Sequence, residues 1–111
     1  MGLSTHVLDL VTGRPAAGVE ILASLNGELI GTFQTDEDGR CQDMLGDQPL
    51  STGLYSLKFK VGAYLSATHV SVSEPPFFDE VLIQFVVSDT ARHYHVPLLV
   101  SPYGYSTYRG S

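Results

Sequence analysis

The last nineteen residues, 93–111, read HYHVPLLVSPYGYSTYRGS and predict two strands joined by a tight turn at residues 101–104. Successive side chains of a strand point to opposite faces of its sheet, so residues two apart share a face. His93 and His95 therefore lie on one face. The opposite face is apolar and is expected to belong to the core, through Tyr94, Val96, Leu98 and Val100. Because segment 105–111 is dense in polar side chains, we expect an ordered strand there rather than a frayed end.

Strand-like patterns recur upstream and predict five further short strands, at residues 4–10, 18–25, 29–35, 54–61 and 80–87. The dipeptide Asn26-Gly27 separates two of them and is the strongest hairpin signal in the chain. Residues 61–69 form the only segment that favours a helix. Many short strands with regularly spaced turns are typical of an all-β antiparallel β-sandwich. We expect a single domain that spans residues 1–111.

The composition limits the classes of protein to which this chain can belong. Its 111 residues suit one domain with a real core, since 43% are hydrophobic and 16% are charged. A net charge of −6 and six dispersed basic residues argue against nucleic-acid binding. No run approaches the roughly 20 apolar residues of a membrane helix, and no signal peptide is visible. We therefore expect a cytoplasmic protein with neither nucleic-acid nor membrane partners.

Two kinds of site receive limited support from the sequence. The single cysteine, Cys41, cannot form an internal disulfide, and we expect it to be a packed small side chain rather than a nucleophile. No Gly-x-Ser-x-Gly motif is present, so a serine nucleophile is not predicted. His93 and His95 could bind zinc with His6 as a third ligand, because a catalytic zinc site needs three protein ligands. This alternative stays open.

Histidine and arginine are the candidate catalytic side chains. His6 and His95 could each act as a general base near neutral pH, which contributes roughly 10²–10⁴ in rate. Arg40, which follows an Asp-Gly turn, could bind an anion and stabilise developing negative charge. Structural alternatives are a hydrogen-bonded strand histidine for His6 and a surface ion pair with Asp36 or Asp38 for Arg40.

Other polar residues have mainly structural interpretations. His69 is expected to be a surface histidine favoured by the C-terminal end of the predicted helix. Tyr108 and Arg109 could protect the edge of a sheet from aggregation, and the carboxylate of Ser111 would be a further acceptor in an ordered tail. The residues alone thus predict hydrolysis of a small, polar, anionic molecule, with water as the nucleophile.

Five motifs together carry a resemblance to a known family. They fall in the order LSTHVLD at 3–9, TGRPA at 12–16, TDEDGR at 35–40, HYHVPLL at 93–99 and YRGS at 108–111. With these motifs the chain resembles the 5-hydroxyisourate hydrolases, the transthyretin-related proteins of purine catabolism, over essentially its whole length. The terminal YRGS is the most specific of the five. Asp79 departs from the proline expected in many relatives, which affects a loop rather than the chemistry.

The resemblance implies a transthyretin-like sandwich of two four-stranded sheets with one short helix, assembled as a homotetramer that is a dimer of dimers. It implies that each active site lies in a channel between dimers and takes residues from more than one subunit. The implied catalytic residues are His6, Arg40 and His95. Substrate binding would involve His6 and Arg40 again, together with Tyr108 and Ser111. No metal or organic cofactor is implied, and His93 is given a supporting role.

The implied reaction is hydrolysis of a ring amide of 5-hydroxyisourate, in urate degradation towards allantoin. Its product is 2-oxo-4-hydroxy-4-carboxy-5-ureidoimidazoline. We assign His95 as the base that deprotonates water, His6 as the residue that orients or shuttles the proton, and Arg40 as the anion-binding group. The alternative is a non-enzymatic small-molecule carrier, since transthyretin shares the fold. A carrier has no use for these three residues and the terminal YRGS as a set.

Overall fold

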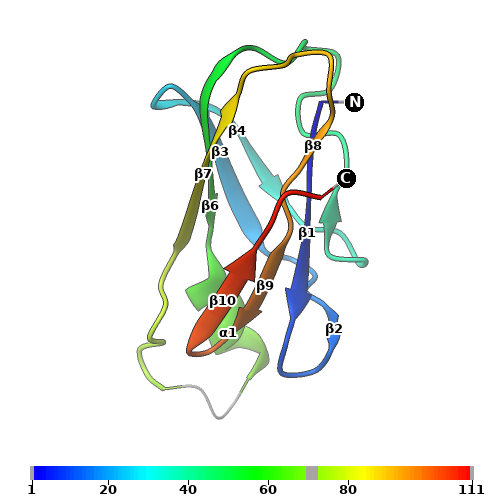
Figure 1. The fold of residues 1–111 in the computed structure, drawn as a ribbon. Helices are drawn as coiled ribbons and strands as arrows, with labels where there is room; N and C mark the ends of the chain where they lie inside the picture. Colours follow the sequence, from blue (N-terminus) through cyan, green and yellow to red (C-terminus); the bar gives the residue numbers. More distant parts are fainter. Residues whose placement is uncertain (1, 70–72, 111) are drawn as a thin grey trace.

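The computed structural model describes residues 2–69 and 73–110 of the chain and places them in two facing β-sheets with one short helix (Figure 1). The elements are, in order, β1 (Leu3–Asp9), β2 (Arg14–Pro15), β3 (Glu20–Leu25), β4 (Glu28–Gln34), β5 (Arg40–Cys41), β6 (Gly53–Phe59), α1 (Val61–Thr68), β7 (Val81–Val87), β8 (Tyr94–His95), β9 (Leu98–Ser101) and β10 (Gly104–Thr107). The predicted β-sandwich with one short helix is therefore confirmed. No helix in the described ranges is both long and apolar enough to cross a membrane.

One sheet has four strands, and the other has a path of four strands with two short strands added to it. One follows the order β4-β3-β6-β7, and every pairing in it is antiparallel. The other follows the order β10-β9-β1-β2, and the two-residue strands β5 and β8 also pair with β1. In this second sheet β1 runs parallel to β8 and β9, which differs from the purely antiparallel pairing expected from the sequence. Through these pairings, β1 at the beginning of the chain lies beside β8 and β9 near its end.

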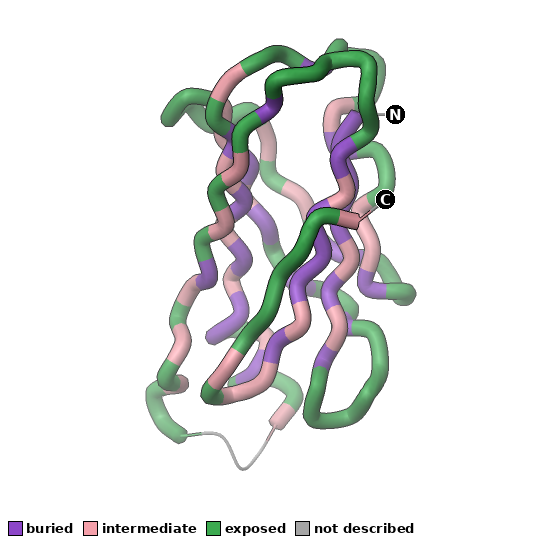
Figure 2. The backbone as a smooth tube through the Cα atoms, viewed as in Figure 1, coloured by how far each residue is buried: buried purple, intermediate pink, exposed green. Residues whose placement is uncertain are grey.

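The core lies between the two sheets and is built from the apolar faces that alternation predicts. Figure 2 shows buried residues along β1 and on the inner sides of the neighbouring strands, and exposed residues along most of the last segment. All four apolar residues of the predicted face in 94–100 are buried. Thr5, although polar, is also fully buried, and its hydroxyl donates to the carbonyl of Val96 at 2.6 Å. This bond helps to hold β1 against the segment that carries the histidines.

The hairpin between β3 and β4 confirms the prediction made from Asn26-Gly27. Both residues have positive φ angles, 51° for Asn26 and 87° for Gly27. Two successive positive φ angles are the requirement of a type I′ turn, whose twist matches that of the flanking strands. Asn26 also ties the turn to β6, because its Oδ1 accepts a hydrogen bond from the backbone N–H of Leu54 at 2.9 Å.

Helix α1 begins and ends close to the predicted boundaries, but His69 is not the surface residue that the sequence suggested. Its Nε2–H donates to Oδ2 of Asp9 at 2.6 Å, and only 12% of the histidine side chain and 1% of the aspartate side chain are exposed. The Tyr64 hydroxyl donates to the same Asp9 oxygen at 2.8 Å. A buried carboxylate at the end of β1 therefore attracts the histidine inward and fixes the helix to the sheet.

Burial and hydrogen bonding set the protonation of this Asp9 cluster. Burial alone would raise the pKa of Asp9, but hydrogen bonds from His69, Tyr64 and the backbone of Val11 outweigh it and leave that pKa below its usual value. Burial, together with the bond to Asp9, raises the pKa of Tyr64 to about 12. The tyrosine hydroxyl is therefore a permanent donor, and the cluster is a fixed link between β1 and α1.

Candidate active site

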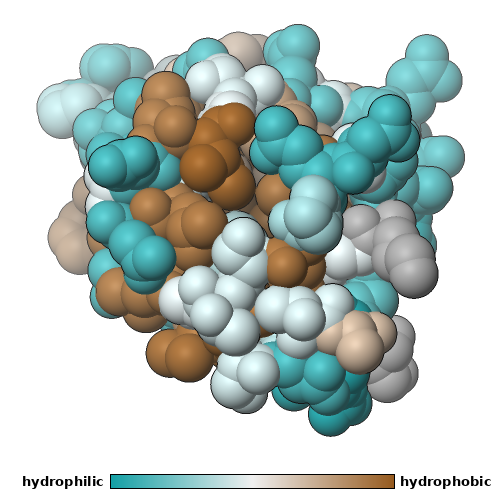
Figure 3. All heavy atoms as spheres, turned by 90° about the horizontal axis from the view of Figure 1, so that it is seen from above, coloured by the Kyte–Doolittle hydropathy of each residue, from teal (hydrophilic) through white to brown (hydrophobic). Residues whose placement is uncertain are grey.

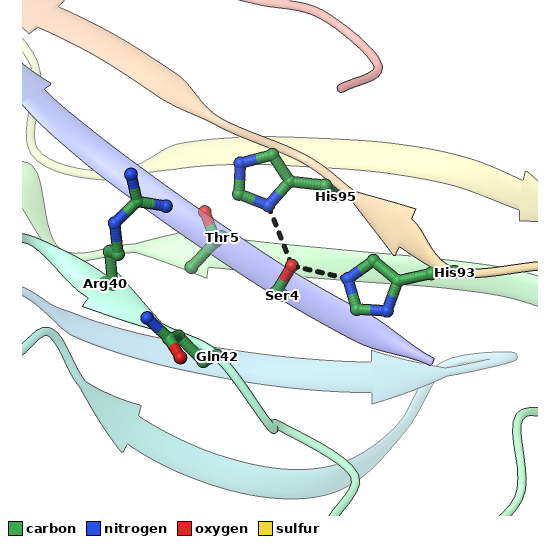
Figure 4. A pocket seen from close by; sticks show the side chains of 6 residues that line it. All are labelled: Ser4, Thr5, Arg40, Gln42, His93 and His95. Carbon is green, nitrogen blue, oxygen red and sulfur yellow. Dashed lines mark hydrogen bonds between the residues drawn. The ribbon is translucent and has the colours of Figure 1, made fainter. Parts of the chain in front are cut away.

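A cavity with a volume of about 400 Å³ lies on the sheet that contains β1. Most of its lining side chains are polar, and they come from three separate parts of the sequence: Ser4 and Thr5, Arg40 and Gln42, His93 and His95. Figure 4 shows these side chains grouped around one hollow, with the Arg40 guanidinium on one side and the two imidazoles on the other. The cavity thus combines a permanent cation with groups that can accept a proton.

Strand pairing brings the three segments together. The antiparallel pairing of β1 with β5 places His6 opposite Arg40, and the parallel pairing of β1 with β8 places Ser4 opposite His95. Ser4 and His6 lie two residues apart on β1, so they share the face that carries the cavity. His6 stands beside Arg40 but is not among the residues that line the cavity. Of the predicted catalytic residues, the fold therefore gathers Arg40 and His95 in one cavity and His6 next to it.

A tight turn fixes the backbone of Arg40. Oδ1 of Asp36 accepts hydrogen bonds from the backbone N–H groups of Asp38 at 2.9 Å and of Arg40 at 3.0 Å. Gly39 between them has a φ of +72°, and a Cβ there would lie 2.5 Å from the carbonyl oxygen of Val7. Only glycine fits this position. Within residues 2–69 and 73–110 the Arg40 guanidinium forms no ion pair with Asp36 or Asp38, so the structural alternative proposed for it is wrong.

Ser4 bridges the two histidines of the cavity, a role that the sequence analysis missed. Its Oγ lies 2.8 Å from Nε2 of His93 and 2.7 Å from Nδ1 of His95 (Figure 4, dashed lines). The signal that was available is its position two residues before His6 on a predicted strand. That spacing placed Ser4 on the site face, but only the parallel pairing of β1 with β8 brings it to the histidines.

The surroundings of His95 favour its neutral form. Burial lowers the pKa of His95, and the positive charge of Arg40 and the potential charges of His6 and His93 lower it further. A lowered pKa leaves the imidazole unprotonated at neutral pH, which is the state that a general base requires. The cavity therefore holds a base in its active form beside an arginine that can bind an anion.

The C-terminal segment is held against His95. The backbone N–H of Gly110 donates to the carbonyl of His95 at 2.7 Å, and a Cβ on Gly110 would lie only 2.5 Å from Cδ2 of the His95 ring. The Arg109 guanidinium stacks on Tyr94, 4.4 Å from the centre of its ring. Arg109 thus anchors the tail, and Gly110 allows the backbone to approach the imidazole closely.

The last two predicted site residues are placed differently. Tyr108 is 58% exposed and lines a separate, mainly apolar hollow of about 160 Å³ together with Arg109 and residues of β7. Within this chain it does not line the cavity of Arg40 and His95. Ser111 lies outside the described residues. The described side chains contain no cluster of three or more histidine, cysteine or acidic residues that could hold a metal ion, so His6, His93 and His95 do not form the three-ligand arrangement considered above.

Comparison of the sequence with known proteins identifies a matching family model and similar proteins over nearly the whole chain. The HIUase/Transthyretin family model matches residues 3–110. A 5-hydroxyisourate hydrolase of Caulobacter vibrioides is 50% identical over 99% of this chain and 98% of its own length. A 5-hydroxyisourate hydrolase of Pseudomonas aeruginosa is 47% identical over 98% of this chain and 90% of its own length.

Solved structures agree with these sequence matches. The 5-hydroxyisourate hydrolase of Klebsiella pneumoniae superposes with a TM-score of 0.86 at 37% identity and covers 100% of both chains. Sea bream transthyretin, solved in complex with thyroxine, gives a TM-score of 0.88 at 28% identity over 99% of this chain and 95% of its own. The fold and the polar cavity define a transthyretin-like sandwich with a histidine and arginine site. The chain belongs to the HIUase/Transthyretin family.

Proposed function

We propose that this protein is a hydrolase that opens a ring amide of 5-hydroxyisourate to give 2-oxo-4-hydroxy-4-carboxy-5-ureidoimidazoline in urate degradation. The observation that carries the proposal is the cavity in which Arg40 faces His95. Whole-length relatives that are 47–50% identical bear the same activity in their names. The match to residues 3–110 supports one catalytic domain that spans the chain.

The proposed mechanism uses side chains and water alone. His95, kept neutral by burial and by its positive neighbours, removes a proton from a water molecule. The resulting hydroxide attacks the amide carbonyl, and the Arg40 guanidinium stabilises the negative charge that develops on the carbonyl oxygen. The bond between carbon and ring nitrogen then breaks, and the nitrogen takes a proton. His6, opposite Arg40 on the neighbouring strand, orients or shuttles the proton.

We propose a homotetramer, a dimer of dimers, as the assembly that completes the site. Strands β7 and β10 are edge strands of their sheets, and both carry exposed apolar or aromatic side chains, including Leu82, Val86 and Tyr105. Figure 3, a view onto the upper end of the molecule, shows hydrophobic residues gathered over its left and central part with hydrophilic residues around them. Exposed edges and apolar surface of this kind favour association with another copy.

In the tetramer, the exposed Tyr108 and the Ser111 end of one subunit contribute to substrate binding in the site of a neighbouring subunit. The separation of Tyr108 from the cavity within one chain supports this arrangement. Separation of the subunits is therefore expected to weaken substrate binding.

We also propose a cytoplasmic location, where the one cysteine, Cys41, remains reduced.

The proposal is tested by generating 5-hydroxyisourate in situ with urate oxidase and following its decay by stopped-flow ultraviolet absorbance. We expect decay well above the spontaneous rate, and no loss of that rate when a chelator is present. Arg40→Ala is expected to lower kcat by roughly 100-fold or more, because it removes a charged group that stabilises the oxyanion. Arg14→Ala, which removes an exposed arginine of β2, is the matched control and should leave the rate unchanged.

A folded wild-type protein that leaves the spontaneous rate unchanged would contradict the proposal and favour the non-enzymatic carrier. Loss of activity with a chelator and its recovery with zinc would contradict the mechanism without metal. A carrier is not favoured by the cavity itself, because its lining provides an arginine and histidines that hydrolysis can use and that a carrier does not need.

A further inference from the structure

The hydroxyl of Ser4 is in hydrogen-bond contact with two imidazoles at once. Its Oγ lies 2.8 Å from Nε2 of His93 and 2.7 Å from Nδ1 of His95. Ser4 is only 6% exposed, although it contributes to the lining of the cavity, whereas His93 is exposed to solvent. All three groups line the cavity, and their hydrogen bonds run from His95, through a nearly buried hydroxyl, to the solvent-exposed His93.

A serine hydroxyl has one hydrogen, so Ser4 can donate to only one of the two nitrogens and must accept from the other. In one arrangement Nδ1–H of His95 donates to Ser4, Ser4 donates to Nε2 of His93, and Nε2 of His95 keeps a free lone pair. In the other arrangement both bonds are reversed, and each histidine carries its hydrogen on Nε2. The tautomer of one histidine thus determines the tautomer of the other.

Only the first arrangement makes His95 a base on the cavity side. Figure 4 shows the second nitrogen of His95 pointing away from Ser4, towards the side on which Arg40 lies. A free lone pair on that nitrogen is what a general base needs, and the bond to Ser4 is what keeps the hydrogen on Nδ1. A partner that fixes the tautomer of a histidine in this way is a recurrent feature of catalytic sites.

We propose that Ser4 is a positioning residue that couples His95 to His93 and relays protons between the cavity and solvent. This inference rests on the hydrolase function proposed above. When Nε2 of His95 takes a proton from water, the Nδ1–H bond of His95 breaks and its proton passes to Ser4 Oγ. The original Ser4 proton passes to Nε2 of His93, so the positive charge moves to the exposed imidazole.

The relay conserves protons over the reaction. When the ring nitrogen leaves, Nε2 of His95 protonates it, Ser4 passes its proton back to Nδ1 of His95, and the protonated His93 returns a proton from its Nε2 to Ser4. The titratable and charged groups that face His95 are Arg40, His6 and His93, and the permanent charge of Arg40 opposes a positive charge on His95. His93 lines the same cavity but is exposed to solvent, whereas His95 is partly buried, so water can stabilise the charge better on His93.

The kinetic test compares Ser4→Ala with the wild-type enzyme in the 5-hydroxyisourate assay. We expect kcat to fall roughly 10- to 100-fold with KM changed less than about threefold, and the dependence of kcat on pH to shift, because the base loses the partner that fixes its tautomer. Ser24→Ala, on β3 of the other sheet, is the matched control and should behave as wild type. Wild-type kcat and an unchanged pH profile in folded Ser4→Ala would overturn the inference.

A double-mutant cycle separates a relay from independent contributions. If Ser4 acts through His93, then Ser4→Ala and the double variant Ser4→Ala/His93→Ala should have the same kcat within about twofold. Losses that multiply in the double variant would overturn the coupling. Should Ser4→Ala fail to fold, Ser4→Cys preserves the volume of the side chain while weakening its hydrogen bonds, and the same comparison applies.

A measurement that does not depend on turnover distinguishes failure of this inference from failure of the proposed function. The ¹⁵N shifts of the imidazole nitrogens report which nitrogen of His95 carries hydrogen. We expect His95 to carry it on Nδ1 in the wild type and to shift towards Nε2 in Ser4→Ala or Ser4→Cys. An inactive wild type with this coupling would overturn the hydrolase and leave the positioning role intact. If the wild type is active but the tautomer of His95 is the same in the wild type and in the Ser4 variants, the positioning role alone would be overturned.

Discussion

Replacement of Gly110 by alanine tests whether the C-terminal segment determines the position of the His95 ring. A Cβ at this position would lie 2.5 Å from Cδ2 of His95 and 3.1 Å from both Cβ and Cγ of the same residue. The ring or the tail must move by about 0.9 Å to bring the shortest of these contacts to an ordinary 3.4 Å. Gly110→Ala therefore forces a choice between displacing the imidazole and releasing the tail.

Displacement of the imidazole reduces catalysis, and release of the tail reduces stability, each by an amount that can be estimated. A displacement of about 1 Å at a catalytic group can lower the rate by roughly 100-fold. Release of the tail would instead break the bond from Gly110 N–H to the His95 carbonyl, worth about 1 kcal/mol. It would also remove the stacking of Arg109 on Tyr94, worth about 0.5–1 kcal/mol. We thus expect a loss in kcat of about 10- to 100-fold with a loss of only about 1–2 kcal/mol in the free energy of unfolding.

The assay is stopped-flow decay of 5-hydroxyisourate, combined with chemical denaturation to measure stability. Gly104→Ala is the matched control, because it adds the same methyl group to the same terminal hairpin. A Cβ at Gly104 would meet only Oγ of Ser101, at 3.7 Å, which is an ordinary contact. Gly104→Ala should therefore retain its activity and lose little stability.

Two results would refute this reasoning. If Gly110→Ala kept wild-type kcat and KM, the close approach of the tail would have no effect on the imidazole. If Gly104→Ala lost as much activity as Gly110→Ala, the loss would reflect the hairpin in general rather than the contact with His95.

The remaining predictions concern His95 and Asp9. His95→Asn should fold and lower kcat by roughly 10²–10⁴-fold, and wild-type turnover in a folded His95→Asn would contradict the base assignment. In the wild type, kcat should fall with decreasing pH below about pH 6.5, because burial and positive neighbours lower the pKa of His95; a profile measured from about pH 5 to about pH 8 checks this. Asp9→Asn should destabilise the fold by about 3 kcal/mol, since it breaks a buried pair with His69. The pKa of Asp9 is lowered in the folded state, so its stabilising effect is present above about pH 3.9 and is lost as the pH falls through the lowered pKa. Denaturant unfolding at about pH 7 and about pH 3 should therefore show a smaller acid loss in Asp9→Asn than in the wild type, and an equal loss would contradict the role of Asp9.

Local patterns in the sequence predicted the elements well. Alternation of apolar residues identified the inner faces of strands, and Asn26-Gly27 identified the hairpin through the backbone angles that it allows. The segment that begins at Val61 was correctly predicted to be helical. These features depend on residues within a few positions of one another, which is why a single sequence contains enough information to find them.

Contacts between distant segments were harder to predict. The role of Ser4 depends on parallel pairing between β1 and β8, and nothing local in either strand indicates that pairing. His69 was misjudged because its partner, Asp9, is 60 residues away in the sequence. Tyr108 belongs to the YRGS motif, from which a role in the site was expected, but within this chain it lines a different hollow. In each case, the outcome depends on how segments far apart in the sequence pack together, and the local sequence pattern does not show this.

The pairing of β1 with the end of the chain also has a consequence for folding kinetics. Ser4 is 89 residues from His93 and 91 residues from His95, so the cavity forms only when nearly the whole chain has been brought together. Contacts of such long range are closed slowly, because their loop entropy is lost before the contact is gained. In a refolding experiment, recovery of catalysis should therefore be slower than formation of the hairpin between β3 and β4. The activity of the enzyme can then be used to follow the last stage of folding.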